Sequence, residues 1–324
     1  MRLSIAMCTY NGATFLRDQL QSLAAQTRQP DELVVCDDAS SDDTCAILDA
    51  FAAKAPFSVR RVRNQTNIGA TKNFDQAIGL CSGDIIALCD QDDVWRHDKL
   101  ARVESAFRKP AVGLAFSDAE VVDSQLRSIS PSLWAIVSLD APLQRQIEEG
   151  DALAVLIAGW FVTGATMAFR ARFRNLALPI PSDLTLVHDG WIAAVVATVA
   201  RVGCIDECLI RYREHPAQLI GPPRKARVPQ ARGRALLERL NPYAEQIAVA
   251  RRLEERVGRQ SAFPLRTGVK EQLLGRIAHY QARSTLPSRR VARLPLVLRE
   301  LMSRRYHRYS NGLASAAKDL VTSL

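Results

Sequence analysis

The most informative segment of this chain reads Ile85-Ile86-Ala87-Leu88-Cys89-Asp90-Gln91-Asp92-Asp93-Val94-Trp95. An apolar run with the length of a buried strand leads directly into a loop that carries three carboxylates. Oxygen ligands at a strand end suit Mg²⁺ or Mn²⁺, and Mg²⁺ often binds one or two carboxylates together with phosphate oxygens. The segment therefore predicts a divalent-cation site for a phosphate-bearing ligand. Taken alone, the acidic cluster favours a simpler interpretation, a turn that caps a helix beginning near Asp98.

Strand-like and helix-like patterns alternate on both sides of this segment. Strands are expected at Leu3–Cys8, Leu33–Cys36, Val59–Val62, Ile85–Cys89 and Val112–Phe116, with helices at Phe15–Leu23, Thr44–Ala53, Lys72–Leu80 and from Asp98. This alternation predicts an α/β fold with a Rossmann-like, mostly parallel sheet flanked by helices. Ligands of such sheets bind beyond the carboxyl ends of the strands. Polar clusters follow three of the strands, at Thr9–Gly12, Asp37–Asp38 and Asp90–Asp93, so we expect one ligand to contact all three.

Charge is distributed unevenly along the chain. Residues 221–324 carry 22 of the 43 Lys and Arg residues but only 7 of the 34 Asp and Glu residues. With 324 residues, 48% of them hydrophobic, the chain is long enough for one large domain and an appendage. We therefore expect an α/β domain over residues 1–220 and a basic helical appendage over 221–324. Within the appendage, Val269, Leu273, Ile277 and Tyr280 recur at helical spacing.

Cysteine usage and the apolar segments bear on where the protein works. The seven cysteines include no Cys-x-x-Cys pair, and several lie in strand-like runs, which predicts reduced thiols in a cytosolic protein. The apolar stretch at the N-terminus is too short for a signal peptide, so no export is expected. The uncharged run Ala152–Phe169 has the length of a membrane span, but Gly159 and Gly164 interrupt it. A buried helix followed by a strand is expected there.

Five motifs occur in one order over residues 1–215. They are Ala6-Met7-Cys8-Thr9-Tyr10-Asn11-Gly12, Val35-Cys36-Asp37-Asp38-Ala39-Ser40, Asn67-Ile68-Gly69, Asp90-Gln91-Asp92-Asp93-Val94-Trp95 and His188-Asp189. In this combination the chain resembles the family 2 glycosyltransferases, and within them the rhamnosyltransferase-like branch. The resemblance implies the GT-A fold, a nucleoside-diphosphate sugar donor, a Mg²⁺ or Mn²⁺ ion, and inversion at the anomeric carbon.

The resemblance also implies roles for particular residues. Thr9, Tyr10 and Asp38 would hold the nucleoside, with Asp38 accepting from a base N–H. Asn11 and Asp37 belong to the same substrate-binding set. Asp90 would lie near the ribose and the metal, Asp92 would be a metal ligand, and Asp189 would be the general base. Without the other motifs, the favoured interpretation of Asp189 would be an N-cap ahead of the helix over Trp191–Ala200.

The chemistry of sugar transfer asks for the same residue types. A nucleoside diphosphate leaves with growing negative charge, which a bound cation stabilises. An acceptor hydroxyl must lose its proton as it attacks the opposite face of the sugar, so a carboxylate is needed across the sugar from the metal. The fold must therefore bring Asp92 and Asp189 to one cleft.

Further candidates have two interpretations each. His215, after a strand expected at Cys208–Arg213, is either a further metal or diphosphate ligand or an ordinary hydrogen-bonded histidine. Asn67 and Asn73 lie at a helix start that can meet phosphate, although capping is the preferred interpretation for Asn67. Gly164, expected within a strand, either lets the backbone approach the substrate or serves tight packing.

Residues 287–309 combine arginines with apolar side chains. The arginines are 289, 290, 293, 299, 304, 305 and 308, and the apolar residues are Leu294, Leu298, Leu301, Met302, Tyr306 and Tyr309. This composition is typical of helices that lie in a membrane interface, which favours docking on an anionic membrane. A solvated appendage or a subunit contact, which would make a homo-oligomer, is the alternative. Nucleic acid is not expected, because no recognised binding module accompanies the charge.

The sequence therefore predicts an inverting, metal-dependent glycosyltransferase of surface polysaccharide synthesis. The resemblance alone implies that the sugar is rhamnose from its dTDP donor, and that the acceptor is a glycan or a lipid-linked molecule at the cytoplasmic face of the membrane. One alternative is a nucleotidyltransferase that makes the activated sugar, but Thr9–Thr14 contains one glycine and no cation where a phosphate loop is needed. Another alternative is a non-catalytic subunit that binds nucleotide sugars.

Overall fold

The computed structural model describes residues 1–184, 186–216, 218 and 243–321. The chain forms two compact units. The first comprises Met1–Leu156 and Trp160–Ala226, and the second comprises Ile157–Gly159 and Arg227–Leu324.

The first unit is an α/β structure built around one sheet. Its strands are β1 (Leu3–Thr9), β2 (Glu32–Asp37), β3 (Ser58–Arg63), β4 (Ile85–Cys89), β5 (Val94–Trp95), β6 (Val112–Val122), β7 (Ser128–Ser130), β8 (Met167–Arg170) and β9 (Arg201–Arg213). Its α-helices are α1 (Leu16–Ala24), α2 (Thr44–Ala52), α3 (Ala70–Leu80), α4 (Lys99–Ala106), α5 (Leu133–Val137), α6 (Ala141–Gln146), α7 (Ala152–Leu156), α8 (Arg174–Ala177) and α9 (His188–Val199).

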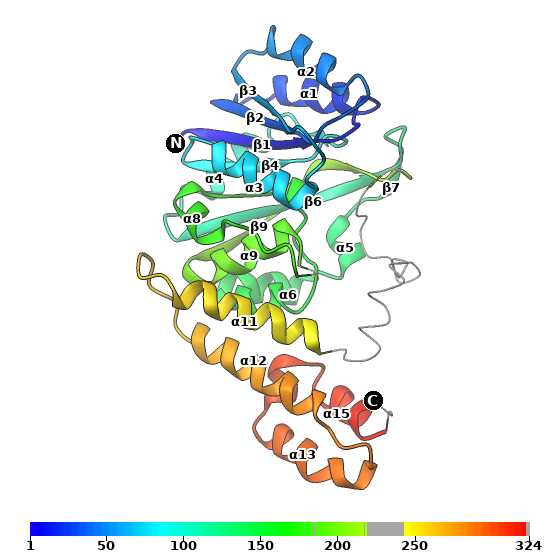
Figure 1. The fold of residues 1–324 in the computed structure, drawn as a ribbon, viewed down its shortest axis with the longest axis vertical. Coiled ribbons are helices and arrows are strands. Elements are labelled where there is room, and N and C mark those ends of the chain that lie inside the picture. The colour runs from blue at the N-terminus through cyan, green and yellow to red at the C-terminus, as the bar shows by residue number, and fades with distance from the viewer. Residues whose placement is uncertain (185, 217, 219–242, 322–324) are drawn as a thin grey trace. The chain divides into compact units, whose positions relative to one another are not determined.

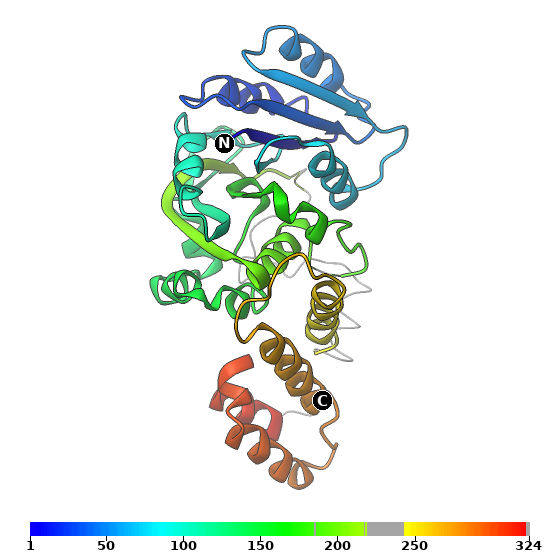
Figure 2. The ribbon, with the colours of Figure 1, turned by 90° about the vertical axis from the view of Figure 1, so that its left-hand side faces the viewer.

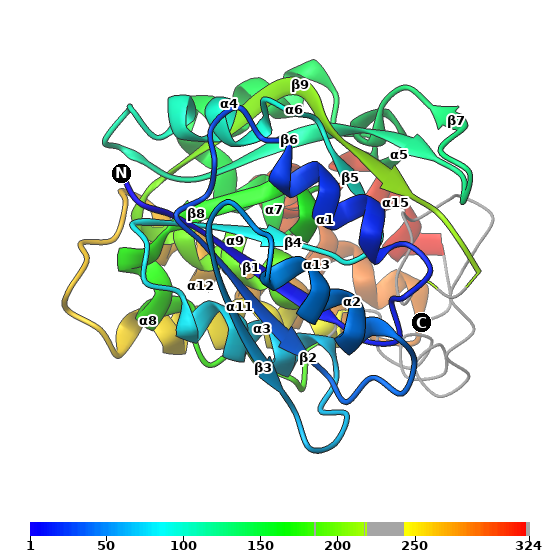
Figure 3. The ribbon, with the colours of Figure 1, turned by 90° about the horizontal axis from the view of Figure 1, so that it is seen from above.

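Strands β1 to β4 form the predicted parallel half of the sheet. The strand order is β3-β2-β1-β4, and every neighbouring pair is parallel. Helices α1 and α2 cover one face, and α3 covers the other (Figures 1 and 3). Strands β1 and β4 are buried almost throughout, as expected for parallel strands covered on both faces. The carboxyl ends of β1, β2 and β4 consequently share one edge, where the three polar clusters lie.

The other half of the sheet is mixed. Strand β8 lies between β4 and β6 and is antiparallel to both, whereas β6 and β9 are parallel. The predicted α/β fold is confirmed, but the sheet is parallel only in part, because alternating patterns do not specify strand direction. Strand β9 begins at Arg201, earlier than expected, and the register shifts in its pairing with β6 accompany the strong curvature visible in Figure 2.

Two local expectations have different outcomes. The run Ala152–Phe169 forms a helix, α7, followed by β8, as expected. Gly164 does not lie in a strand, however; it begins a short 3-10 turn, Gly164–Thr166, that precedes β8. Among the described residues, no helix combines the length and the apolar composition that a membrane crossing requires.

The second unit is helical. Its helices are α11 (Ala244–Gly258), α12 (Val269–Ser284), α13 (Arg290–Met302), α14 (Arg305–Tyr309) and α15 (Leu313–Val321). A small apolar cluster of Val297, Tyr306 and Ala316 is surrounded by buried charged groups, among them Arg283 and Asp319. The helical spacing from Val269 to Tyr280 is confirmed as α12. The sequence also predicts a helix start at Asn241-Pro242, with Asn241 as the cap and Pro242 in the first position, but both residues lie outside the described ranges.

Candidate active site

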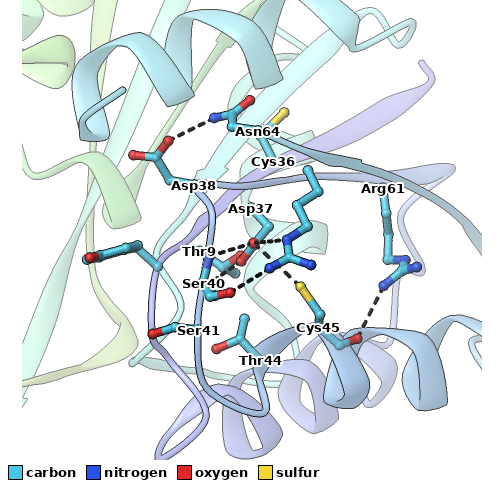
Figure 4. A network of polar contacts seen from close by, with 12 residues as sticks. Thr9, Cys36, Asp37, Asp38, Ser40, Ser41, Thr44, Cys45, Arg61 and Asn64 are labelled. Atoms are coloured by element: carbon cyan, nitrogen blue, oxygen red, sulfur yellow. Dashed lines mark hydrogen bonds and ion pairs between the residues drawn. The ribbon is translucent and has the colours of Figure 1, made fainter. Parts of the chain in front are cut away.

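The loops after β1 and β2 are joined by Asp37. Its carboxylate accepts bonds from Thr9 Oγ1 at 2.9 Å and from the backbone N–H of Ser40 at 3.0 Å, and Arg63 lies 3.7 Å away (Figure 4). Thr9 and Asp37 are each only 2% exposed. Both were expected to contact the nucleotide, yet the bonds of Asp37 are made within the protein. Asp37 and Thr9 therefore shape the loop that would receive a ligand.

Asp38 points away from the hydrogen bonds of Asp37 and stabilises the turn before α3. Its carboxylate accepts bonds from Asn64 Nδ2 at 2.8 Å and from the backbone N–H groups of Ile68 and Gly69 at 2.8 and 2.9 Å. Asn67 Oδ1 also accepts from the Gly69 N–H, at 3.1 Å, in the turn before α3, whose N-cap is Gly69 rather than Asn67. Asp38 thus connects the second polar cluster to the Asn67-Ile68-Gly69 motif.

Asn73 is buried beneath this connection. Its amide donates to the backbone oxygen of Cys36 at 2.7 Å, and its Oδ1 accepts from Asn64 at 3.0 Å. The side chain is 1% exposed. In this geometry Asn73 holds β2 against α3, and a direct contact with phosphate, as expected from the sequence, would require these bonds to break.

Gln91 connects the first polar cluster to the acidic loop. Its amide accepts from the backbone N–H of Tyr10 at 2.9 Å and donates to the backbone oxygen of Tyr10 at 3.0 Å. A Cβ on Gly12 would lie 2.1 Å from Gln91 Oε1, so glycine is required for this contact. Asn11 has a positive φ of 46° and binds Ser40 and Ser41 on the second loop. The Tyr10 side chain is left 48% exposed beside the acidic loop.

Asp92 and His215, both predicted metal ligands, lie in contact. Asp92 Oδ2 is 2.9 Å from His215 Nε2. The contact follows from the antiparallel pairing of β5 with β9, which brings the end of β9 beside the acidic loop. The buried Arg213 fixes this arrangement, because its Nε donates to the Asp92 backbone oxygen at 2.7 Å and its backbone N–H donates to Asp93 Oδ1 at 3.0 Å.

The carboxylates of the loop repel one another. Burial, together with the charges of Asp92 and Asp189, raises the pKa of Asp90 to about 7. Burial and the charges of Asp92 and Asp90 also raise the pKa of Asp93 well above its usual value. Asp93 Oδ2 is buried and has no hydrogen-bond partner within the described part of the chain. Such crowding of carboxyl groups favours the binding of a cation, whose positive charge would lower these pKa values again.

One internal cation lies beneath the loop. Lys99 is fully buried, donates from Nζ to the backbone oxygen of Ala165, and has Nζ 3.6 Å from the centre of the Trp95 ring. Burial lowers the pKa of Lys99 to about 7 against the opposing effect of Cys89, Asp93 and Asp90. Its single charge does not neutralise three carboxylates.

Asp189 lies in the first turn of α9, after the N-cap residue Val187. Its Oδ2 accepts from the Gly164 N–H at 2.9 Å, and its Oδ1 accepts from the Gly190 N–H at 2.6 Å. Since β8 runs antiparallel to β4, the turn before β8 lies near the acidic loop after β4. Asp189 is consequently close enough to Asp90 for its charge to raise the pKa of Asp90. A Cβ on Gly164 would lie 2.8 Å from His188 Nε2, so packing also requires glycine there.

The residues present fit a divalent cation that shares its ligands with a substrate. Within the described ranges, no three His, Cys, Asp or Glu side chains gather in the way that a metal cage made by the protein alone requires. The Asp92–His215 pair offers one carboxylate and one imidazole as part of a ligand set. Mg²⁺ sites commonly complete such a set with phosphate oxygens and water.

Sequence reasoning missed two contributors to this site, Arg213 and Lys99. Arg213 holds the Asp92 backbone in place, and Lys99 lies beneath the acidic loop. Asp93 belonged to the predicted acidic cluster but had no role of its own there. Arg213 and Lys99 look in the sequence like ordinary surface cations.

The comparisons with known proteins agree with this geometry. A family model described as glycosyl transferase family 2 matches residues 4–173. An uncharacterized glycosyltransferase of Nostoc sp. is 27% identical over 221 residues, which cover 67% of this chain and 66% of that protein. The dTDP-rhamnosyl transferase RfbG of Shigella flexneri is 30% identical over 130 residues, which cover 39% of this chain and 43% of that protein.

Among solved structures, S. aureus TarS 1-349 in complex with UDP-GlcNAc has a TM-score of 0.57 at 17% identity. The match covers 99% of this chain and 82% of that chain, and it shows a shared fold. The alignments with the two curated relatives span less than two thirds of the length of either relative.

Proposed function

The chain belongs to glycosyl transferase family 2, and we propose that it transfers a sugar from a nucleoside-diphosphate donor to an acceptor hydroxyl with inversion at the anomeric carbon. One observation carries the proposal. Asp189, which suits a general base, accepts from the Gly164 N–H in the turn before β8, and the antiparallel pairing of β8 with β4 puts that turn beside the acidic loop that suits a metal and diphosphate. These two groups are far apart in the sequence, and both are needed for this reaction.

The donor would occupy the shared edge of β1, β2 and β4. Tyr10, exposed beside the acidic loop, offers a ring against which a base can stack. Asp38 would accept from a base N–H while it continues to hold the Gly69 loop. Thr9, Asn11 and Asp37 would act by shaping the loops, since their polar groups are bonded within the protein.

Asp92 and His215 would hold Mg²⁺ or Mn²⁺ together with the diphosphate, with Asp90 next to them. When bound, the cation stabilises the negative charge that develops on the departing diphosphate. Arg213 keeps the Asp92 backbone in place, so the carboxylate is positioned before the ligand arrives. Lys99 limits the repulsion among the carboxylates from below.

Asp189 would take the proton from the acceptor. Its two oxygens each accept one backbone N–H, which orients the carboxylate and leaves further lone pairs for an acceptor hydroxyl. As the acceptor oxygen forms its bond to the anomeric carbon, the bond from that carbon to the diphosphate breaks. The electron pair leaves with the nucleoside diphosphate, and the proton goes to Asp189.

The finer assignments are part of the same proposal. The motif resemblance and the RfbG relative support dTDP-rhamnose as the donor. A glycan or lipid-linked acceptor of surface polysaccharide synthesis fits the family, and the basic second unit supports work at the cytoplasmic membrane surface.

A donor-hydrolysis screen tests the proposal. The full chain is incubated with UDP-, GDP- and dTDP-sugars with and without Mn²⁺, and release of the nucleoside diphosphate is measured. We expect metal-dependent release from one donor class, which Asp92→Ala abolishes. Asp43→Asn is a matched control, because Asp43 is an exposed carboxylate at the start of α2 outside the site. Two outcomes would contradict the proposal. Release of pyrophosphate from a nucleoside triphosphate and a sugar phosphate would indicate a nucleotidyltransferase, and donor binding without turnover would indicate a non-catalytic subunit.

A further inference from the structure

Helix α13 exposes a row of apolar side chains. Val291, Leu294, Leu298 and Met302 are 87%, 47%, 46% and 78% exposed. Their spacing of three or four residues puts all four on one side of the helix. We call these four residues the α13 apolar face. Isolated exposed apolar residues are ordinary, but a continuous row on one helix marks an interaction surface.

The same helix buries charged residues on its other side. Arg293 is 1% exposed and donates from Nη1 to the backbone oxygen of Asp319 at 2.8 Å. Glu300 is 3% exposed and accepts from Arg305 Nη1 at 2.9 Å, and its other oxygen lies 3.0 Å from His279 Nδ1. The inner side of α13 therefore carries hydrogen-bonded charged groups beside the buried Val297, whereas the α13 apolar face is left outside.

Arginines surround the apolar face. Arg290 and Arg299 are exposed, and helical geometry puts them on opposite flanks of the face. Arg289 and Arg304 are exposed at the two ends of the helix. Glu300 is the one acidic residue between positions 287 and 309, and it is buried, so within this segment no exposed carboxylate opposes the positive charge.

We propose that the α13 apolar face, with Arg290 and Arg299 on its flanks, docks the protein on an anionic lipid bilayer. Apolar side chains enter the acyl boundary, while the flanking guanidinium groups bind lipid phosphates. The inference deepens the proposed function, on which it rests for the reason to be at a membrane. It also revises the sequence expectation, because Arg293, Tyr306 and Tyr309 are buried and do not belong to the docking surface.

Vesicle flotation of the full chain tests the inference. The vesicles contain phosphatidylcholine alone or phosphatidylcholine with phosphatidylglycerol. We expect flotation with the acidic vesicles, and the triple variant Leu294→Ser/Leu298→Ser/Met302→Ser should weaken partitioning at least about tenfold. Arg290→Gln should weaken it about fivefold, and added salt should reduce it further. Ile129→Ser, which alters a residue 46% exposed on β7 in the first unit, should have no effect.

Three outcomes would overturn the inference. One is a wild-type chain that does not float, and another is a triple variant that floats as well as the wild type. The third is a dimer in analytical ultracentrifugation that the triple variant converts to a monomer, which would assign the face to a second copy of the chain. An unchanged unfolding temperature of the triple variant excludes misfolding. Donor hydrolysis without vesicles is measured in parallel, so a failure of docking is distinguishable from a failure of the proposed transfer reaction.

Discussion

Two buried carboxylates, one in each unit, have opposite surroundings. Asp319 in the second unit accepts four bonds, from Arg283 Nε at 2.7 Å, Arg283 Nη2 at 3.0 Å, Tyr306 at 2.7 Å and Tyr243 at 3.0 Å. Asp93 in the first unit accepts a bond from the Arg213 N–H on one oxygen, and its other oxygen has no partner among the described residues. Both side chains are almost fully buried.

The difference separates structural charge from charge kept for a ligand. Burial alone would raise the pKa of Asp319, but the bonds from Arg283 and Tyr306 outweigh it and lower the pKa. The pKa of Asp93 is raised, because neighbouring carboxylates add to the effect of burial. The fold compensates the charge of Asp319 but leaves Asp93 without a compensating partner on one oxygen. Such an arrangement lowers the stability of the folded state around Asp93, as is common at ligand sites.

The largest expected effect is on turnover, in the first unit. Asp189→Asn keeps the size of the side chain but removes the basic carboxylate, so kcat should fall by about 10²–10⁴-fold. Donor affinity, measured by thermal shift with the nucleoside diphosphate, should change little. Asp43→Asn serves again as the matched control. A fall in donor affinity with unchanged kcat would assign Asp189 to binding and remove the general base from the mechanism.

In the second unit the expected effect is on stability, and its free energy is similar in size to the loss of turnover in Asp189→Asn. Asp319→Asn leaves Arg283 buried without its charged partner, which should cost about 3–5 kcal/mol in the free energy of unfolding. Urea unfolding followed by circular dichroism measures this loss. Donor hydrolysis at a temperature where the variant stays folded should be retained. Loss of less than about 1 kcal/mol would show that the network is not structural.

The pH dependence of this loss has a definite sign. Because the pKa of Asp319 is lowered by folding, its contribution is fully present above the pKa of an unfolded aspartate, about 3.9, and is lost as pH falls through the folded value. The difference in unfolding free energy between the wild type and Asp319→Asn should therefore be constant near neutral pH and shrink below about pH 4. A difference that grows with acidity would contradict the compensated character of this site.

Particular residues show how far the sequence could predict this molecule. Strands β1, β2 and β4 and the three polar clusters were predictable, because buried parallel strands are near-continuous apolar runs and ligand loops follow their ends. The direction of β8 was not predictable, although it is what brings Gly164 and Asp189 to the acidic loop. Strand direction depends on contacts between distant segments, which no local pattern records.

The burial of particular Lys and Arg residues was also not predictable from the sequence. Lys99, Arg213 and Arg293 have partners that are mostly backbone oxygens, those of Ala165, Asp92 and Asp319. A backbone oxygen has no sequence signature, so a buried arginine and a solvated one look alike in the sequence. The same limit explains why all of residues 287–309 were expected in a membrane interface, although Arg293, Tyr306 and Tyr309 are buried in the structure.

Metal binding should affect the surroundings of Asp93 in the first unit but not those of Asp319 in the second. Since the acidic loop holds excess negative charge, Mn²⁺ with a nucleoside diphosphate should stabilise the first unit, by about 2.7 kcal/mol at a concentration 100-fold above its dissociation constant. Asp92→Ala should remove this stabilisation, whereas Asp319→Asn should keep it. Differential scanning calorimetry with EDTA as the metal-free reference measures both. Equal stabilisation of wild type and Asp92→Ala would place the cation elsewhere.

The smallest expected effects distinguish the two sides of α13. Val297 is 1% exposed in the apolar cluster, so Val297→Ala should lower the free energy of unfolding by about 2 kcal/mol. Val291 is 87% exposed, and Val291→Ala should change it by less than about 0.5 kcal/mol, because nothing in the fold is lost with that side chain. The unfolding free energies of the two variants, Val297→Ala and Val291→Ala, are measured in urea at the same pH and temperature. A large loss in Val291→Ala would mean that its side chain packs within the protein in solution, and α13 would then have no apolar face to offer a membrane.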